Sequence, residues 1–576
     1  MVPTILGRIR SARDHAPPEA APLSAAEPAL ARLLIGLTLV ALAAGVVARL
    51  FQFLQRPSLW MDELLLSLDV VTLPFGRLAG PLPFEQVAPV LFVWAQHLSI
   101  AAFGVGEAAL RLVPLLSGLL LLPLVAWSAW RLGGPRAALI AGGLAAVAPL
   151  LVRYSNEAKQ YEGEAFVAAA MTALTIHMLG RAVDRRRALL FVLAGLVALG
   201  FSVSAIFVVA AAWSAVALDA LGRRDRRAVP MLAASALLWP ATFLGLYRLG
   251  YSDPATQAYL ARFWANAYLF AGEHSVGTVL GRIFVAPVSA TTNLTGSAPL
   301  PLRVLLWLLA VAGCWRLSRR ELPALALLLL PFALVIAAAV LGRYVVAGRL
   351  LLFFVPGLLV LVGLGADTVV RRLPAPSWAV LPLGALLAFV PARWSFYSIR
   401  NPAIELPREA VRELLGRRGP GEPVYVSARS IPSWAFYTTD WRSSDRTRLS
   451  TLLRRAVEAG PNSGNAPSRG HAVRNEGYDR LLTTAGRLEV LGIASGLENA
   501  GLPVPETPDP GWAENEVDRL RATGSPTAWL YLHHQRQEPV RELVRAVEAA
   551  GGRVLLRLTE PDSTRVLRVA LPPPIR

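Results

Sequence analysis

Charged residues, lysine and cysteine are all scarce in this chain. Only 17% of its 576 residues are charged, against about 25% in soluble domains, and 54% are hydrophobic. The single cysteine, Cys314, excludes an intramolecular disulfide and carries no information about the compartment. No P-loop, dinucleotide-binding fingerprint or HExxH zinc motif is present, so the energy for any chemistry must come with the substrate.

The hydrophobic residues are gathered in blocks of the length that crosses a membrane. A helix needs about 20 apolar residues to span a hydrocarbon core of roughly 30 Å. The blocks predict a polytopic α-helical membrane protein with about eleven spans, at 31–52, 108–130, 136–152, 163–180, 188–201, 203–221, 228–249, 301–317, 322–341, 350–366 and 377–396.

The basic residues predict the topology of these spans. A net charge of +18 could indicate nucleic acid, but the arginines cluster in short loops between apolar blocks, as the positive-inside rule requires. We therefore expect no nucleic-acid partner. If the polar leader 1–30 is cytoplasmic and the first span is uncleaved, every basic loop is cytoplasmic, provided that 53–107 forms one external segment. The apolar piece 88–104 then lies along the membrane or re-enters it, with a true crossing as the alternative.

The composition changes after residue 397, where short apolar runs alternate with amphipathic stretches. We expect an extracytoplasmic α/β domain over 397–576, with a largely parallel sheet and a flexible insertion at 460–477. The predicted strands are 422–428, 486–493, 527–534 and 552–558, and the predicted helices are 512–523 and 538–550.

Two adjacent acids stand in the apolar stretch "LWMDELLLS" of the first external segment, Asp62 and Glu63. If 61–70 is helical, Asp62 and Asp69 share one face. A carboxylate partly shielded from water is suited to act as a general base. The alternative is that the two acids complement a helix N-terminus, with Ser58 as its cap.

Three further stretches on the external side carry polar residues beside aromatic ones. Glu85 lies in "FEQVAPVLFVW". The segment "YSNEAKQY" holds Glu157, Lys159 and Tyr161 close together in sequence. These three residues could line a pocket for a sugar or a phosphate, or they could form a solvated helix end. The segment "GRYVVAGR" places Arg343, Tyr344 and Arg349 on the side that the charge bias disfavours. These arginines are expected to bind an anion, or else to reach lipid phosphates.

In this order the segments resemble the GT-C superfamily of membrane glycosyltransferases, most nearly family 39, which includes protein O-mannosyltransferases and the lipid A aminoarabinose transferase. The "LWMDELLLS" loop, "FEQVAPVLFVW", "YSNEAKQY" and "GRLLLFFVPGLLVLV" are similar to family segments, although "QVAP" departs from the commoner Lys-Pro-Pro or Pro-Pro form. The resemblance covers about residues 30–400.

The resemblance implies inverting transfer of a sugar from a polyprenyl-phosphate donor to an acceptor hydroxyl on the extracytoplasmic face. Asp62 would be the base, Glu63 and Glu85 would orient hydroxyl groups, and the donor phosphate would meet Lys159, Arg343 and Arg349. Glu157, Tyr161 and Tyr344 complete the predicted substrate-binding set.

The lipid-linked donor is the only cofactor-like molecule implied, no metal ligand is assigned, and dependence on a divalent ion stays open. The partners would be membrane lipids and an acceptor glycan, lipid or protein. The near absence of lysine favours a GC-rich bacterial genome, and hence a bacterial inner membrane. A flippase or transporter for lipid-linked sugars, and a non-catalytic envelope scaffold, are the alternative functions.

Overall fold

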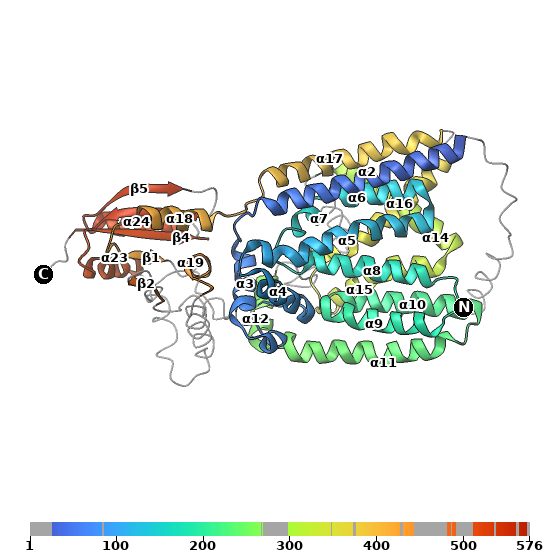
Figure 1. Ribbon diagram of the computed structural model, residues 1–576, viewed down its shortest axis with the longest axis horizontal. Coiled ribbons are helices and arrows are strands. Elements are labelled where there is room, and N and C mark those ends of the chain that lie inside the picture. The colour runs from blue at the N-terminus through green and yellow to red at the C-terminus, as the bar shows by residue number, and fades with distance from the viewer. Residues whose placement is uncertain are drawn as a thin grey trace.

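The protein consists of a long helical bundle with a small α/β domain at one end (Figure 1). The structure, a computed structural model, describes residues 26–572 except 83, 85, 266–267, 269–297, 347, 373–375, 427–429, 443–480, 485–486, 491–510, 535–536 and 560–563. The leader up to residue 25 and the insertion at 460–477 therefore lie outside the described residues.

Each of the eleven predicted spans is largely helical, which confirms the polytopic helical fold, although 136–152 is divided between two helices and 350–366 begins in a 3-10 segment. Eight helices in the described part of the chain are long and apolar enough to cross a membrane. The remaining predicted spans fall on α6, α8 and α9. The helices are α2 (Ala26–Leu54), α5 (Glu107–Gly133), α6 (Pro135–Val147), α7 (Pro149–Tyr154), α8 (Tyr161–Met178), α9 (Arg185–Phe201), α10 (Ala205–Arg223), α11 (Ala228–Leu246), α14 (Leu300–Arg320), α15 (Leu322–Val340), α16 (Val355–Arg372) and α17 (Val380–Arg400).

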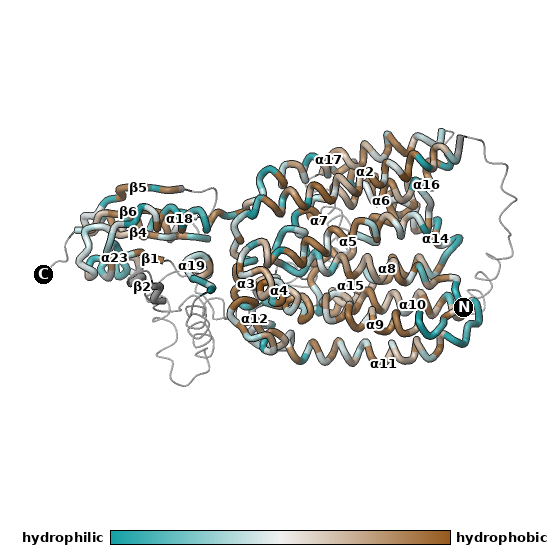
Figure 2. Tube along the Cα trace, in the orientation of Figure 1, coloured by the Kyte–Doolittle hydropathy of each residue, from teal (hydrophilic) through white to brown (hydrophobic). Residues whose placement is uncertain are grey.

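Helix α16 is largely buried and packs against α14 and α6. Its glycines permit the close approach, because a Cβ added at Gly365 would lie 1.8 Å from the carbonyl oxygen of Leu309. The peripheral helix α2 instead exposes Leu39 and Val40 by more than 60%, as a lipid-facing surface should. Figure 2 shows the resulting contrast between the hydrophobic bundle and the more hydrophilic terminal domain.

The helices between the first two spans gather at the end of the bundle that faces the α/β domain (Figure 1), here called the site end. They are α3 (Met61–Thr72), the short η1 (Phe75–Ala79) and α4 (Val90–Phe103), and they lie beside α12 (Pro254–Phe263). With 14 residues, α4 rises about 21 Å and is too short to cross the roughly 30 Å core. That α4 lies along the membrane surface stays a prediction.

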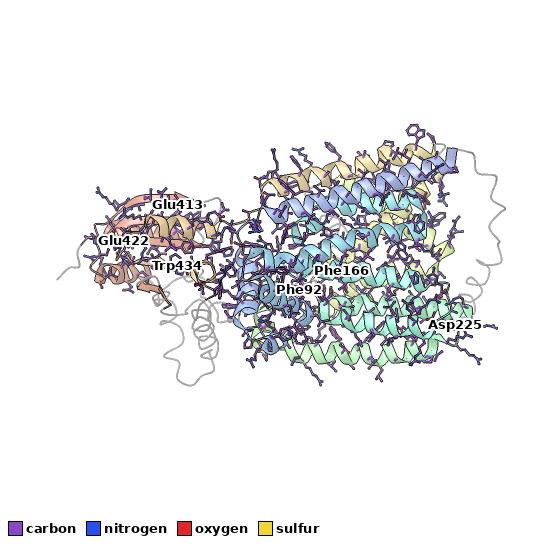
Figure 3. The ribbon with its side chains drawn as sticks, in the orientation of Figure 1. Phe92, Phe166, Asp225, Glu413, Glu422 and Trp434 are labelled. Carbon is purple, nitrogen blue, oxygen red and sulfur yellow. The ribbon has the colours of Figure 1, made fainter. Side chains whose placement is uncertain are left out.

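The opposite end of the bundle carries basic loops. Asp225 lies there, whereas Glu422 and Trp434 lie in the α/β domain at the site end (Figure 3). The Arg223 guanidinium donates to the carbonyl of Arg181, so two of the basic loops meet at this end. The charge bias therefore separates the two ends of the bundle, although the side of the membrane each end faces stays a prediction.

The terminal domain contains a mixed sheet, so the prediction of a largely parallel sheet was wrong. The strand order is β1-β4-β6-β5, in which only β1 and β4 are parallel. The unpredicted strand β6 forms a hairpin with β5 and inserts between β5 and β4, antiparallel to both. The elements are α18 (Pro407–Arg417), β1 (Val424–Val426), α19 (Ile431–Thr438), α23 (Trp512–Ala522), β4 (Thr527–His533), α24 (Gln537–Ala549), β5 (Arg553–Thr559) and β6 (Thr564–Ala570), with a separate hairpin of β2 (Leu481–Thr484) and β3 (Arg487–Val490).

Candidate active site

A proline that interrupts the helical backbone lies next to the loop of the candidate site. Pro149 separates α6 from α7 and has no N–H to donate to the carbonyl of Ala145. The fully buried Arg49 of α2 supplies the missing donors, to the carbonyls of Ala145 and Ala146 at 3.1 and 3.2 Å. Its Nε atom donates to the Ser155 hydroxyl, which fixes the start of the "SNEAKQ" loop beneath the site.

Glu63 and Arg111 form a buried pair that holds helix α3 in place. Arg111 donates to both Glu63 carboxylate oxygens, at 2.7 and 2.6 Å, and to the carbonyls of Pro57 and Ser58. The backbone N–H of Ala158 donates to the same carboxylate at 2.6 Å. Both Glu63 oxygens are thus engaged within the protein, so we assign this side chain to positioning rather than to the predicted contact with substrate hydroxyls.

Asp62, the residue before Glu63 on α3, faces two cations from distant parts of the chain. Lys159 Nζ lies 3.4 Å from its Oδ1 atom, and Arg349 Nη1 lies 2.7 Å from its Oδ2 atom. The Asp62 side chain is 20% exposed and that of Arg349 19%, whereas Lys159 is 4% exposed. Lys159 is also the only lysine in the chain. The structure therefore brings together a partly exposed acidic side chain and two cations.

Burial and charge act in opposite directions on this cluster. Burial alone would raise the pKa of Asp62, but the charges of Lys159 and Arg349 outweigh it and hold that pKa below its usual value. Burial also lowers the pKa of Lys159, although the negative charge of Asp62 acts to raise it. At neutral pH Asp62 is ionised and is held by its two cations.

Aromatic rings surround the Arg349 guanidinium. Its central carbon lies 5.3 Å from the ring centroid of Tyr161 and 5.8 Å from that of Trp264. Cation–π contacts of this kind fix a guanidinium while leaving its N–H groups free to bind an anion. Tyr161 thus lies in the cluster, beside Arg349.

Other predicted site residues are placed around this cluster or apart from it. Glu157 is buried and pairs with Arg153. Tyr344 donates to the Leu350 carbonyl, and Arg343 is exposed and forms no ion pair with a described residue. Glu85 lies outside the described residues, although its neighbour Gln86 accepts a hydrogen bond from Lys159 at 2.7 Å.

The start of α3 is also held by the terminal domain. Glu405 accepts a hydrogen bond from the Met61 backbone N–H at 2.9 Å, and its carboxylate pairs with His533 and His534 at 2.8 and 2.7 Å. Tyr437 lies beside them, and its hydroxyl accepts a hydrogen bond from the Leu59 N–H. Despite the burial of Glu405, its bonds to the two histidines hold its pKa far below the usual range.

Sequence reasoning missed Arg111 and Glu405 as parts of this site. Arg111 is a cation at the site end of an apolar block, so the argument that singled out Arg343 and Arg349 could have found it. Glu405 lies in an ordinary polar linker and has no such signal. Among the described residues, no group of three or more His, Cys, Asp or Glu side chains is arranged to hold a metal ion.

Comparison with known proteins bears on part of the chain. Residues 87–247 match the family described as dolichyl-phosphate-mannose-protein mannosyltransferase. No curated protein matches the chain.

Several solved structures are similar at low identity. ArnT from Cupriavidus metallidurans is 18% identical when bound to undecaprenyl phosphate, with a TM-score of 0.46 over 93% of this chain and 97% of that one. In the apo state it is 15% identical, with a TM-score of 0.48 over 94% and 98%. The Archaeoglobus fulgidus oligosaccharyltransferase in complex with Zn and sulfate is 14% identical, with a TM-score of 0.44 over 69% of this chain and 60% of its own length, so the present chain spans about three fifths of that enzyme.

The family match covers α5 to α11 with the preceding helix α4, and it includes Lys159 and Tyr161 of the cluster. It ends before Arg349 and begins after Asp62, so it does not test the assembled site. Over residues 87–247 the match confirms the predicted resemblance of this multi-pass membrane protein to the GT-C glycosyltransferases.

Proposed function

We propose that the protein is an inverting glycosyltransferase that moves a sugar from a polyprenyl-phosphate donor to an acceptor hydroxyl at the extracytoplasmic membrane face. The observation that carries this proposal is the Asp62 cluster, a partly exposed carboxylate between two cations where the bundle meets the terminal domain. The match of residues 87–247 to a family named for a lipid-phosphate sugar donor supports it.

In the proposed reaction Asp62 removes the proton from the acceptor hydroxyl. The oxygen attacks the anomeric carbon, the new carbon–oxygen bond forms, and the bond from that carbon to the phosphate oxygen breaks with inversion. The electron pair leaves on the polyprenyl phosphate. Because a phosphate is a good leaving group, the site needs to stabilise the growing negative charge more than it needs a general acid.

Lys159 and Arg349 are the proposed ligands of the donor phosphate. Without substrate these two charges lower the pKa of Asp62, which makes it a weak base. A bound phosphate would draw both cations toward itself, and the pKa of Asp62 would then rise toward the working pH. Donor binding would thus activate the base in the same step in which it places the anomeric carbon.

Among the other predicted residues, Glu63 is assigned a positioning role and Tyr161 supports Arg349. Glu85, Arg343 and Tyr344 stay predictions without an assigned step. Dependence on a divalent ion, the bacterial inner membrane and the orientation of the termini also stay proposals.

The test uses purified protein in lipid nanodiscs and a panel of radiolabelled undecaprenyl-phosphate sugars, with a membrane extract as the source of acceptor. Asp62→Asn keeps the shape of the side chain and removes the base, so transfer should fall about 10²–10⁴-fold. Asp518→Asn, at an exposed carboxylate of the terminal domain, is the matched control.

Transfer by Asp62→Asn at the wild-type rate would refute the assignment. Movement of the labelled lipid between leaflets without any transfer of sugar would favour the flippase alternative instead. If neither transfer nor movement occurs and joint replacement of Asp62 and Glu85 leaves the cell envelope unchanged, the scaffold alternative stands.

A further inference from the structure

A polar pocket separate from the Asp62 cluster opens beside Trp60. It comprises about 460 Å³ of space, part of it open to solvent, between the "SNEAKQ" loop and the linker that joins α17 to α18. Asp62, Lys159 and Arg349 do not line it, but Glu63 on α3 and Trp60, which caps that helix, do.

The charges in the pocket cancel. Glu63 is bonded on both oxygens by Arg111, and Glu157 pairs with Arg153 at 2.5 Å. Two acids and two arginines give no net charge, in contrast to the Asp62 cluster with its one acid and two cations. A pocket of this kind selects a neutral ligand, because a charged one would lose its hydration without gaining a counter-ion.

Three buried polar atoms in the pocket wall have no hydrogen-bond partner among the described residues. They are Trp60 Nε1, Asn156 Oδ1 and Glu157 Oε2. The Asn156 amide is oriented by its Nδ2 atom, which donates to Gln52 Oε1 at 3.2 Å, so Oδ1 is the atom left over. These atoms are one donor and two acceptors that the protein leaves unused on residues lining the pocket, where the Arg153 guanidinium also lies 5.9 Å from the Trp60 ring centroid.

A sugar ring has this combination of properties. Each of its hydroxyl groups both donates and accepts a hydrogen bond, and one face of the ring is apolar. A purely apolar ligand would leave the three atoms unsatisfied, at a cost for each buried group. The wall therefore favours a neutral polyhydroxylated ring over a lipid tail.

The mouth of the pocket lies at the level expected for the membrane–water interface. Asn401 and Ile404 contribute to it, directly after the end of α17. The last turns of α17 expose Trp394, Phe396 and Tyr397 by 38, 60 and 62%. Exposed aromatic side chains at a helix end are typical of the headgroup layer. A ligand carried at the membrane surface can therefore reach the pocket.

We propose that this pocket binds a neutral sugar ring of the acceptor, carried at the membrane surface, and so makes the acceptor a glycan or glycolipid. That the bound sugar belongs to the acceptor rests on the proposed transferase function, whereas the binding of a sugar in the pocket does not. The pocket shares α3 with Asp62, and the Glu157 carboxylate is close enough to Asp62 for their charges to interact. A sugar bound there would present its next hydroxyl group toward the base.

The test measures binding by calorimetry to the full chain in nanodiscs. The free probes are the methyl glycosides of glucose, galactose, mannose and arabinose, and the membrane-borne probe is a monoglucosyl diacylglycerol in phosphatidylcholine vesicles.

We expect at least one probe to bind. Trp60→Phe, which removes only the free donor, should weaken that binding about tenfold, and Ile404→Trp, which fills the mouth, should abolish it. Leu415→Trp, at a similarly exposed site on α18, is the matched control and should bind as wild type does.

Binding of the free glycosides would show that the ring alone is recognised, and binding of the glycolipid alone would show that the membrane must present it. Failure of every probe to bind, or binding that Trp60→Phe and Ile404→Trp leave unchanged, overturns the proposal. Undecaprenyl phosphate binding is measured in the same samples. If it persists and Asp62→Asn still loses transfer, only the pocket assignment fails. If a glycoside binds as expected but Asp62→Asn transfers normally, only the transferase function fails.

Discussion

Asp62 and Asp367 are both surrounded by cations, but they differ in how completely those cations are used. Asp367, on α16, is fully buried and pairs with Arg136, Arg316 and Arg371, which engage both of its oxygens. Asp62 is 20% exposed, and its two cations come from a loop and from the short η4 segment (Gly348–Phe354).

The difference separates a structural cluster from a functional one. The Asp367 cluster joins α16 to α6 and α14 and leaves its carboxylate no capacity for another ligand. The Asp62 cluster holds two cations on one partly exposed acidic side chain, so an incoming anion can compete for them. The open geometry, more than the presence of charge in an apolar region, is what indicates a site.

The largest effect should come from removing both cations of the open cluster. Replacing Lys159 and Arg349 together by glutamine should lower kcat/KM for the lipid-linked donor about 10³-fold, because nothing then stabilises the leaving phosphate. The rate of transfer from labelled donor measures this. Arg412→Gln, at an exposed arginine of α18 that forms no ion pair with a described residue, is the control. An equal loss in that control would show that the effect is not specific to the cluster.

Breaking the closed cluster should change stability rather than chemistry. Asp367→Asn leaves three arginines without their buried counter-charge and should lower the free energy of unfolding by about 3 kcal/mol. Thermal unfolding in nanodiscs measures the loss, and turnover per folded molecule should be unchanged. If Asp367→Asn removed transfer without changing the unfolding temperature, the distinction between the two clusters would be lost.

A third carboxylate extends the comparison into the terminal domain. Glu422 accepts hydrogen bonds from Thr527, Trp529, the Gly419 N–H and Arg568, which together outweigh burial and lower its pKa to about 2. Its ionised form therefore stabilises the fold above its ordinary pKa near 4.5, and this stability is lost as the pH falls toward 2.

Glu422→Gln should accordingly cost about 2–3 kcal/mol at pH 7 and progressively less toward pH 3. Urea unfolding of the full chain, followed at several pH values, measures the difference between variant and wild type. A difference that does not change with pH would contradict the assigned cause.

The smallest effect concerns the link between the terminal domain and the open cluster. Glu405→Gln weakens the bond to the Met61 N–H and should lower kcat about fivefold, with the KM for donor unchanged, because α3 and Asp62 are less well positioned. Initial rates at varied donor concentration separate the two constants. Glu413→Gln on α18, which pairs only with Arg417 at 2.7 Å, is the control. A rise in KM with constant kcat would instead place Glu405 in donor binding.

The helical bundle could be predicted because its signal is local. The length and hydropathy of each apolar block decide whether a helix can satisfy its own backbone in a membrane, and all eleven blocks proved largely helical, although the break before Pro149 divides one of them. The strands β1, β4 and β5 were found in the same way. The position of β6 in the sheet was not, because strand order depends on which distant edges pair.

The site was predicted residue by residue but not as an assembly. Arg349 stood out as a cation on the side that the charge bias disfavours, Asp62 as an acid in an apolar stretch, and Lys159 and Tyr161 as neighbours in a polar external segment. The contacts of Arg111 with Glu63, 48 residues away, and of Met61 with Glu405, 344 residues away, depend on tertiary packing that no local pattern encodes.

The single lysine makes the site chemically addressable. Apart from the α-amino group, an amine-directed reagent has only Lys159 to modify in the whole chain. Because this amine is buried against Asp62, its labelling rate would report how often the cluster opens. Protection by a lipid phosphate could then be read as one mass shift on one peptide, without knowledge of the sugar or the acceptor.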